Sequence, residues 1–237
     1  MFGCVDNVFN EDDNTQHIYQ KTIRPITKSV LDGYNGTIFM YGQTTSGKTY
    51  TMLGCPEAPG VLPCALRDIF HFINASNAQN SENSFRIWIS YLEIYNEVIN
   101  DLLVSGNANL KIKEDATDGV AVQGLKKQEV WSFDQAIILM NYGEQHRSYK
   151  ETTLHEHSSR SHTIFKIYIQ NQGPTAQQSK ETGMCVRYSC LNLVDLAGSE
   201  RLNEFDLKVD TLGETAHINK SLFVLANVIN KLAEGKG

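Results

Sequence analysis

The chain has 237 residues, of which 41% are hydrophobic and 20% are charged, so its length and composition are those of one folded globular domain. A largely disordered chain is excluded. The formal net charge of -6 gives no overall basic field, so neither nucleic acid nor a membrane surface is expected as a partner. No apolar run is long enough to predict a membrane span, and no secretory signal peptide opens the sequence.

The cysteines are few and odd in number, and none forms a C-x-x-C pair. This pattern favours a reduced, intracellular setting with buried thiols over disulfides or zinc. The five positions are Cys4, Cys55, Cys64, Cys185 and Cys190.

Hydrophobic periodicity predicts alternating strands and helices, which is typical of an α/β sheet protein. A strand is expected over residues 5–9, followed by a helix over 15–33 that Pro25 should kink and Gly33 should end. A short buried strand is expected over 37–41. Later helices are expected over 61–75, from a capping box at Ser132 and Gln135 to about 149, and over 214–234, with strands over 85–95, 110–113, 120–123, 163–169 and 186–195.

The most specific motif directly follows the strand expected over residues 37–41. Residues 42–49 read GQTTSGKT and match the phosphate-loop pattern G-x-x-x-x-G-K-[ST] in full. Backbone N–H groups of such a loop point at a polyphosphate, Lys48 reaches the β- and γ-phosphates, and the Thr49 hydroxyl binds Mg²⁺. An empty glycine-rich turn is the alternative, and the motif does not separate ATPases, GTPases and small-molecule kinases. The expected nucleotide-binding residues are Gly42, Gln43, Thr44, Thr45, Ser46, Gly47, Lys48 and Thr49.

A second motif, DLAGSE, occupies residues 195–200, at the end of the strand expected over 186–195. It is a candidate sensor of the γ-phosphate. The Asp195 carboxylate at the strand end can hold the Mg²⁺ shell, and the Gly198 N–H can approach a γ-phosphate closely. Taken alone, D-x-x-G is also the composition of an ordinary turn.

A third polar stretch, residues 155–162, reads HEHSSRSH and lies between a helix and a strand. Its small hydroxyls around Arg160 suit a loop that closes on phosphate and magnesium, although a polar surface loop is the plain alternative. Zinc is a further alternative because histidines flank Glu156, but no catalytic zinc spacing fits. An ion pair between Arg160 and Glu200 would form only when both loops close, and it could position the attacking water and accept its proton.

Together the three motifs resemble the kinesin motor domain, and the resemblance extends over nearly the whole chain. The matching words are GQTTSGKTYTM (42–52), SSRSH (158–162) and DLAGSE (195–200). The resemblance implies a P-loop NTPase fold with a central, mostly parallel β-sheet flanked by helices. It also implies one motor domain over residues 1–237 that lacks its first strand and its C-terminal part. Within the family, the sequence is most similar to the centromere-associated mitotic kinesins.

The resemblance implies a microtubule-stimulated ATPase that uses Mg²⁺, converts ATP and water to ADP and phosphate, and couples this to movement. Tyr50 falls where the family often places a ring against adenine, with helix packing as the alternative. The implied catalytic residues are Lys48, Ser159, Arg160, Gly198 and Glu200, and the implied metal ligands are Thr49, Ser159 and, through water, Asp195.

The same resemblance makes microtubules the expected partner. The final helix would lie on tubulin, with Lys126 and Lys127 in a tubulin-contacting loop and Lys220 and Lys231 on or near the helix. For each lysine, a solvated surface charge is the alternative. The full-length protein would dimerise through a coiled coil outside this sequence. It would lie in the cytoplasm on the cytoskeleton, at the spindle or kinetochore if the subfamily resemblance holds.

Two departures from the family pattern keep other functions open. His155 stands where the family usually has Asn, and residues 205–209 replace small residues and glycines with FDLKV. These changes favour, as an alternative, a nucleotide- and microtubule-binding module with impaired turnover. A GTPase is disfavoured because the N-K-x-D pattern of a guanine site has no match, since residues 219–222 read NKSL.

Overall fold

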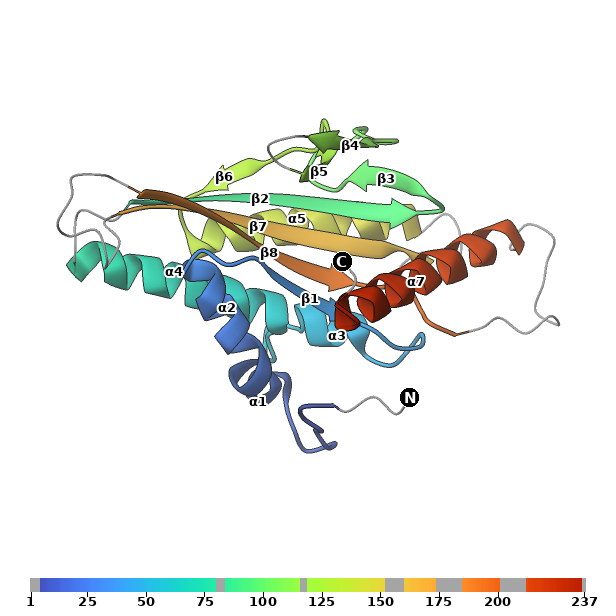
Figure 1. Ribbon diagram of the computed structural model, residues 1–237, viewed down its shortest axis with the longest axis horizontal. Helices are drawn as coiled ribbons and strands as arrows, with labels where there is room; N and C mark the ends of the chain where they lie inside the picture. The colour runs from blue at the N-terminus through green and yellow to red at the C-terminus, as the bar shows by residue number, and fades with distance from the viewer. Residues whose placement is uncertain are drawn as a thin grey trace.

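The computed structural model describes residues 5–79, 84–115, 119–151, 160–173, 185–200 and 212–235. Within them, the chain forms a six-stranded sheet, a separate two-stranded hairpin and helices on both sheet faces (Figure 1). The sheet strands are β1 (Gly36–Met40), β2 (Ser84–Tyr95), β3 (Val98–Asp101), β6 (Gln128–Val130), β7 (His162–Gly173) and β8 (Cys185–Asp195), and the hairpin strands are β4 (Lys111–Asp115) and β5 (Gly119–Gln123). The helices are α1 (Thr15–Ile18), a π-helix (Tyr19–Ile23), α2 (Arg24–Leu31), α3 (Lys48–Leu53), α4 (Val61–Gln79), α5 (Phe133–Glu151) and α7 (Leu212–Ala233).

The sheet has the order β1-β8-β7-β2-β3, and β6 also pairs with β2. Only β1 and β8 run parallel among the described strands, and the other pairs are antiparallel. The α/β fold is therefore confirmed, but the expectation of a mostly parallel sheet is wrong, because the sheet is mixed. The apolar pattern of a buried strand is the same in both directions, so strand direction depends on spatial order that the local sequence does not contain.

The parallel pairing of β1 with β8 positions the site. Met40 and Asp195 are register partners at the ends of β1 and β8, so the loops that follow both strands leave the same edge of the sheet. The backbone contacts continue past the strands: the Leu196 N–H donates to the Met40 carbonyl at 3.3 Å. The phosphate loop and residues 195–200 are consequently neighbours.

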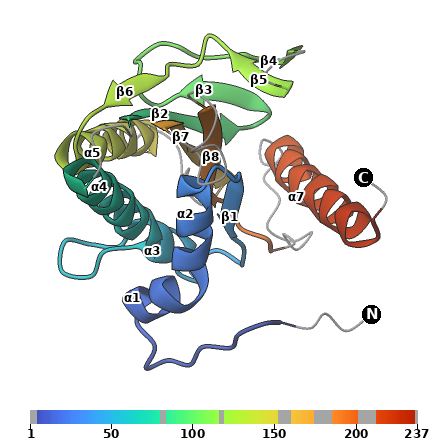
Figure 2. The ribbon, with the colours of Figure 1, turned by 60° about the vertical axis from the view of Figure 1, so that its left-hand side comes forward.

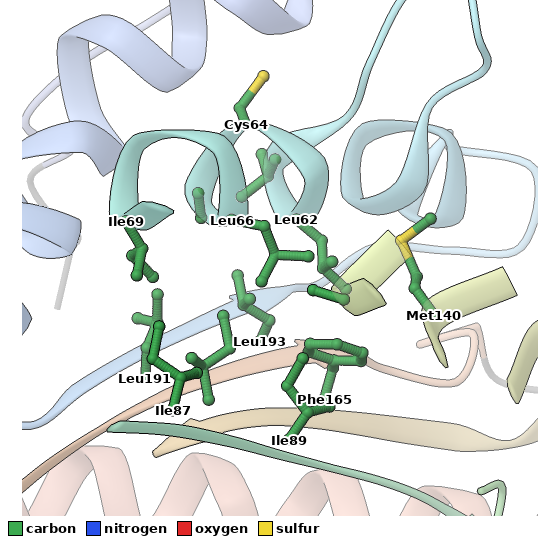
Figure 3. Packing of buried hydrophobic residues seen from close by; sticks show 14 of the residues in the cluster. Leu62, Cys64, Leu66, Ile69, Ile87, Ile89, Met140, Phe165, Leu191 and Leu193 are labelled. Carbon is green, nitrogen blue, oxygen red and sulfur yellow. The ribbon is translucent and has the colours of Figure 1, made fainter. Parts of the chain in front are cut away.

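Helices α3, α4 and α5 cover one face of the sheet, and α7 lies on the opposite side (Figure 2). Figure 3 shows the main core, in which α4 presents Leu62, Leu66 and Ile69 to apolar side chains of the sheet. Each fully buried side chain of this kind contributes about 1.5–3 kcal/mol of transfer free energy. The sheet side chains labelled there are Ile87, Ile89, Phe165, Leu191 and Leu193, and Met140 joins them from α5.

The N-terminal helical region confirms two predicted breaks and corrects one element. A π-helical stretch that ends at Ile23 interrupts it directly before α2, and Pro25 lies in the first turn of α2. Gly33 has φ +105° just past the helix end, a conformation that favours glycine. Residues 5–9 are not a strand, so that prediction is wrong: an apolar alternation without a neighbouring strand has no ladder to join.

The two shortest strands of the large sheet form by pairing with β2, whereas the capping box of α5 could be predicted from the sequence. The strands β3 and β6, which pair with β2, have four and three residues and were not predicted. At the start of α5, the Gln135 N–H donates to Ser132 Oγ at 3.2 Å, and the Gln135 side chain accepts from the Trp131 N–H at 2.9 Å.

No helix in the described parts of the chain is long and apolar enough to cross a membrane.

The cysteines with described side chains are free thiols in three different environments. Cys64 is buried and Cys190 partly buried, and burial raises the pKa of both thiols. Cys55 is exposed, so the expectation of buried thiols is wrong at that position.

Candidate phosphate-binding site

The phosphate loop, residues 42–49, connects the end of β1 to α3. Thr45 and Gly47 have positive φ angles of +66° and +87°, which curl the backbone into a tight loop. A Cβ at Gly42 would lie 2.7 Å from Ser46 Oγ, so a larger residue there would displace the Ser46 side chain. The Lys48 ammonium lies inside the curl and donates to the Gly42 carbonyl at 3.0 Å and the Gln43 carbonyl at 2.8 Å.

Glu200 ties the segment after β8 to this loop. Its carboxylate accepts a hydrogen bond of 2.7 Å from the Thr44 N–H and a second from the Thr44 hydroxyl. The Ser199 N–H donates to the Gly42 carbonyl at 3.1 Å beside these bonds. Partial burial acts to raise the pKa of the Glu200 carboxyl, but the Thr44 hydrogen bonds outweigh it and, with nearby Lys48, hold that pKa below its usual value. The carboxylate is therefore charged at neutral pH.

Gly198 lies under this contact and is buried. A Cβ added there would collide with the Glu200 carboxylate and the Thr44 hydroxyl. Only glycine lets Glu200 fold back over its own backbone onto the loop.

Thr49 and Asp195 form the second connection between the two segments. The Thr49 hydroxyl donates to Asp195 Oδ2 at 2.6 Å. Asp195 is 3% exposed, and its Oδ1 is buried without a hydrogen-bond partner among the described residues. A hydroxyl and a carboxylate oxygen with unused acceptor capacity, beside a phosphate loop, are the oxygen donors that Mg²⁺ prefers. The pair therefore fits the predicted magnesium site.

Arg147 is a buried member of the site that the sequence reasoning missed. Its Nη1 atom lies 3.5 Å from Asp195 Oδ2 and 3.8 Å from Glu144 Oε2, and the Arg147 side chain is only 2% exposed. Burial acts to lower the pKa of Arg147, but Glu144, Tyr91 and Asp195 outweigh it and raise that pKa, so the guanidinium stays charged.

A sequence signal for Arg147 existed. Ala136, Met140, Gly143 and Arg147 are all buried and recur at helical spacing on α5. An arginine at the next position of a core-facing stripe indicates a buried ion pair, because an unpaired buried charge is too unfavourable to persist.

The predicted ion pair between Arg160 and Glu200 is not formed in this conformation. Within the described residues Glu200 contacts Thr44 instead, and Arg160 is partly buried two residues before β7. Ser158 and Ser159 lie outside the described residues, as do His155 and positions 205–209.

The predicted adenine-stacking residue and the zinc alternative are two further expectations for the site. Tyr50 is 55% exposed on α3, next to the loop, and does not pack into the core. Among the described residues no group of three His, Cys, Asp or Glu side chains could hold a metal, but His155, Glu156 and His157 lie outside them.

The four lysines expected to face a filament are all exposed. Lys127 places its Nζ 4.4 Å from the centre of the Tyr168 ring, a cation–π contact, while the Lys126 N–H donates to Asp101 at 2.9 Å. Lys220 and Lys231 lie on α7.

Comparison with known proteins gives a consistent family. Residues 3–237 match the family model described as the kinesin motor domain. Kinesin-like protein KIN-7L of Oryza sativa subsp. japonica is 45% identical over 97% of this chain. Centromere-associated protein E of Homo sapiens is 42% identical over 98% of it. The chain spans 35% of the length of the rice protein and 8% of the human one.

Solved structures have the same fold. The structure of a fast kinesin superposes with a TM-score of 0.86 at 38% identity, covering 98% of this chain and 64% of that one. The mixed sheet with helices on both faces is therefore the fold of that kinesin.

Proposed function

The chain belongs to the kinesin motor-domain family, and from this premise we propose that it binds ATP with Mg²⁺ and hydrolyses it to ADP and phosphate. We further propose that it couples this reaction to microtubule binding and movement. The expected sites of these activities are the phosphate loop, the segments around Arg160 and Glu200, and α7.

The observation that carries this proposal is the double connection between residues 42–49 and residues 195–200. Thr44 with Glu200 and Thr49 with Asp195 are 156 and 146 positions apart in the chain, yet they are in hydrogen-bond contact. A device that senses the last phosphate needs a phosphate loop in contact with a segment that can move when that phosphate leaves. This geometry supports such a device.

The Thr44–Glu200 contact suggests how the sensing works. The Thr44 N–H can donate either to Glu200 or to a phosphate oxygen, and two anions cannot share it without repulsion. A bound γ-phosphate would displace Glu200, and the released carboxylate would pair with Arg160. The pair would then orient the attacking water and accept its proton.

Other residues of the site would bind and orient the substrate. Lys48 would leave the loop carbonyls for the β- and γ-phosphates, the Gly198 N–H would meet the γ-phosphate, and Tyr50 would stack on adenine. Mg²⁺ would neutralise charge on the phosphates. Its ligands would be Thr49 and Ser159, with Asp195 holding a metal-bound water and Arg147 keeping the Asp195 carboxylate in place.

The microtubule-binding surface would include α7 and the loop that carries Lys126 and Lys127. Tubulin is acidic, so exposed lysines can bind it although the chain is negative overall. The proposed contacts also include Lys220 and Lys231 on α7.

The wider biology is proposed from the resemblance and from the relatives. We propose a dimer formed through a coiled coil in the complete protein, with a cytoplasmic location on the cytoskeleton. The name of the human relative supports the spindle or kinetochore as the place of action, whereas several other relatives are plant proteins.

A second function is a nucleotide- and microtubule-binding module with impaired turnover. The observation that favours it is the sequence itself, which has His155 in place of the usual Asn and bulky residues at 205–209. Either change would weaken closure of the segments around the γ-phosphate.

The deciding experiment is phosphate release by the complete protein, measured with and without microtubules and with GTP as a competing nucleotide. We expect ATP turnover that microtubules stimulate several-fold and that equimolar GTP leaves unchanged. Binding of both ATP and microtubules without turnover would support the second function, and recovery of turnover in His155→Asn would locate the defect. Failure to bind ATP would overturn both.

A further inference from the structure

His162 joins two parts of the molecule that the mechanism treats separately. It lies at the start of β7, is 8% exposed, and accepts a hydrogen bond at Nδ1 from the Ala197 N–H at 3.0 Å. Its Nε2 atom lies 2.8 Å from the Ser221 hydroxyl on α7. One imidazole ring therefore spans from the residue before Gly198 to the helix on the other side of the sheet.

The two contacts assign the proton on the ring. A backbone N–H can only donate, so Nδ1 must be the unprotonated nitrogen, and the proton of the neutral ring is on Nε2. Nε2 then donates to Ser221 Oγ. The ring is rigid and buried, so both hydrogen bonds depend on its position.

We propose that His162 is a positioning residue that transmits movement of residues 195–200 to α7. This inference rests on the proposed motor function, in which the γ-phosphate moves Gly198 and α7 contacts the filament. The ring connects the backbone directly beside the phosphate sensor to the helix through two hydrogen bonds. This route from residues 195–200 to α7 does not pass through the phosphate loop.

The test uses hydrogen–deuterium exchange of the complete protein with ADP and with a non-hydrolysable ATP analogue. Ser221→Ala removes the acceptor on α7. His162→Asn keeps an acceptor for Ala197 but is too short to reach Ser221. Asn227→Ala, an exposed residue of the same helix, is the matched control.

In the unmodified protein we expect the two nucleotides to give different exchange both at residues 195–200 and in α7. In Ser221→Ala and in His162→Asn, the difference at 195–200 should persist and the difference in α7 should fall about twofold or more. The double variant should lose no more than either single one, because both remove the same connection. Asn227→Ala should match the unmodified protein.

Two results overturn the inference, and they are distinguishable. An α7 difference that survives in Ser221→Ala and His162→Asn, or that is absent while residues 195–200 respond, overturns the link alone. Absence of any nucleotide-dependent difference in both segments overturns the proposed function and the inference with it. A merely structural role for His162 would lower both responses together and would lower the melting temperature, which also contradicts the proposal.

Discussion

Glu200 binds Thr44 through both the backbone N–H, at 2.7 Å, and the side-chain hydroxyl. The carboxylate thus occupies the donors of a phosphate loop, in a conformation where Arg160 is not its partner. In the proposed function, this carboxylate exchanges the Thr44 contact for an ion pair with Arg160 when a γ-phosphate binds. We interpret the Thr44 contact as the alternative to the Arg160 ion pair in the catalytic cycle.

Glu200→Gln should bind ATP but hydrolyse it about 100-fold more slowly, because the amide cannot accept the proton of the attacking water. Nucleotide affinity and phosphate release, measured on the same preparation, check this. Glu11→Gln, an exposed site far along the chain, is the control. Unchanged turnover in Glu200→Gln would refute the assigned role.

Gly198→Ala should prevent the observed approach of Glu200 to Thr44, because the added methyl group collides with both side chains. We expect turnover to fall about tenfold or more while the domain stays folded, because the methyl group would also keep the Gly198 N–H from its proposed contact with the γ-phosphate. Gly106→Ala is a matched control, since nothing lies within 4 Å of its added Cβ. Gly106→Ala should lower the free energy of unfolding by no more than about 1 kcal/mol, through strain in the backbone. Equal turnover in the two variants would contradict the prediction.

Lys48→Ala should lower nucleotide affinity about 100-fold or more, because the loop loses the cation that faces the β- and γ-phosphates. The lysine also holds the Gly42 and Gln43 carbonyls, so the loop loses two internal hydrogen bonds. Titration with a fluorescent nucleotide measures the change. Lys28→Ala removes an exposed lysine of α2 and should bind as the unmodified protein does. Comparable affinity in both variants would exclude residues 42–49 as the nucleotide site.

Arg147→Met should destabilise the fold by about 3 kcal/mol, because Asp195 and Glu144 lose the buried positive charge between them. Urea unfolding of the two proteins measures the difference in the free energy of unfolding. Arg24→Met removes an arginine that is 42% exposed and pairs with Asp68 at the surface, so it should change stability by less than about 1 kcal/mol. Similar values for the two variants would show that the ion pair of Arg147 is not a buried one in solution.

Acidification should destabilise the protein through His162. Burial lowers the pKa of its imidazole, and the opposing carboxylates Asp195 and Glu97 do not compensate for it. The unfolded chain therefore binds a proton at a higher pH than the folded one. Stability should be fully present above about pH 6.5 and should be lost as the pH falls toward the lower folded-state pKa.

The comparison of His162→Asn with an exposed-histidine variant isolates this effect. His162→Asn should reduce the slope of melting temperature against pH below about pH 6.5, and it should do so more than His71→Gln, which replaces an exposed histidine of α4. An unaltered slope in His162→Asn would assign the acid sensitivity to other groups.

Local chemistry was readable from the sequence by itself. The phosphate loop, its position between a buried strand and a helix, the carboxylate at the end of β8 and the capping box at Ser132 all depend on neighbouring residues. Backbone curvature, helix starts and strand periodicity arise from interactions within a few positions, so the order of residues contains them.

Only the tertiary structure decided which distant groups meet. These contacts are the parallel pairing of β1 with β8, the contact of Glu200 with Thr44, the burial of Arg147 against Asp195 and the bridge from Ala197 through His162 to Ser221, and all of them join residues far apart in the chain. Their physical basis is packing and desolvation, which depend on what surrounds a side chain in space. The sequence of a strand does not determine whether it pairs parallel or antiparallel with its neighbour. The sequence around a charged residue likewise does not determine which distant residue its side chain contacts in the folded protein.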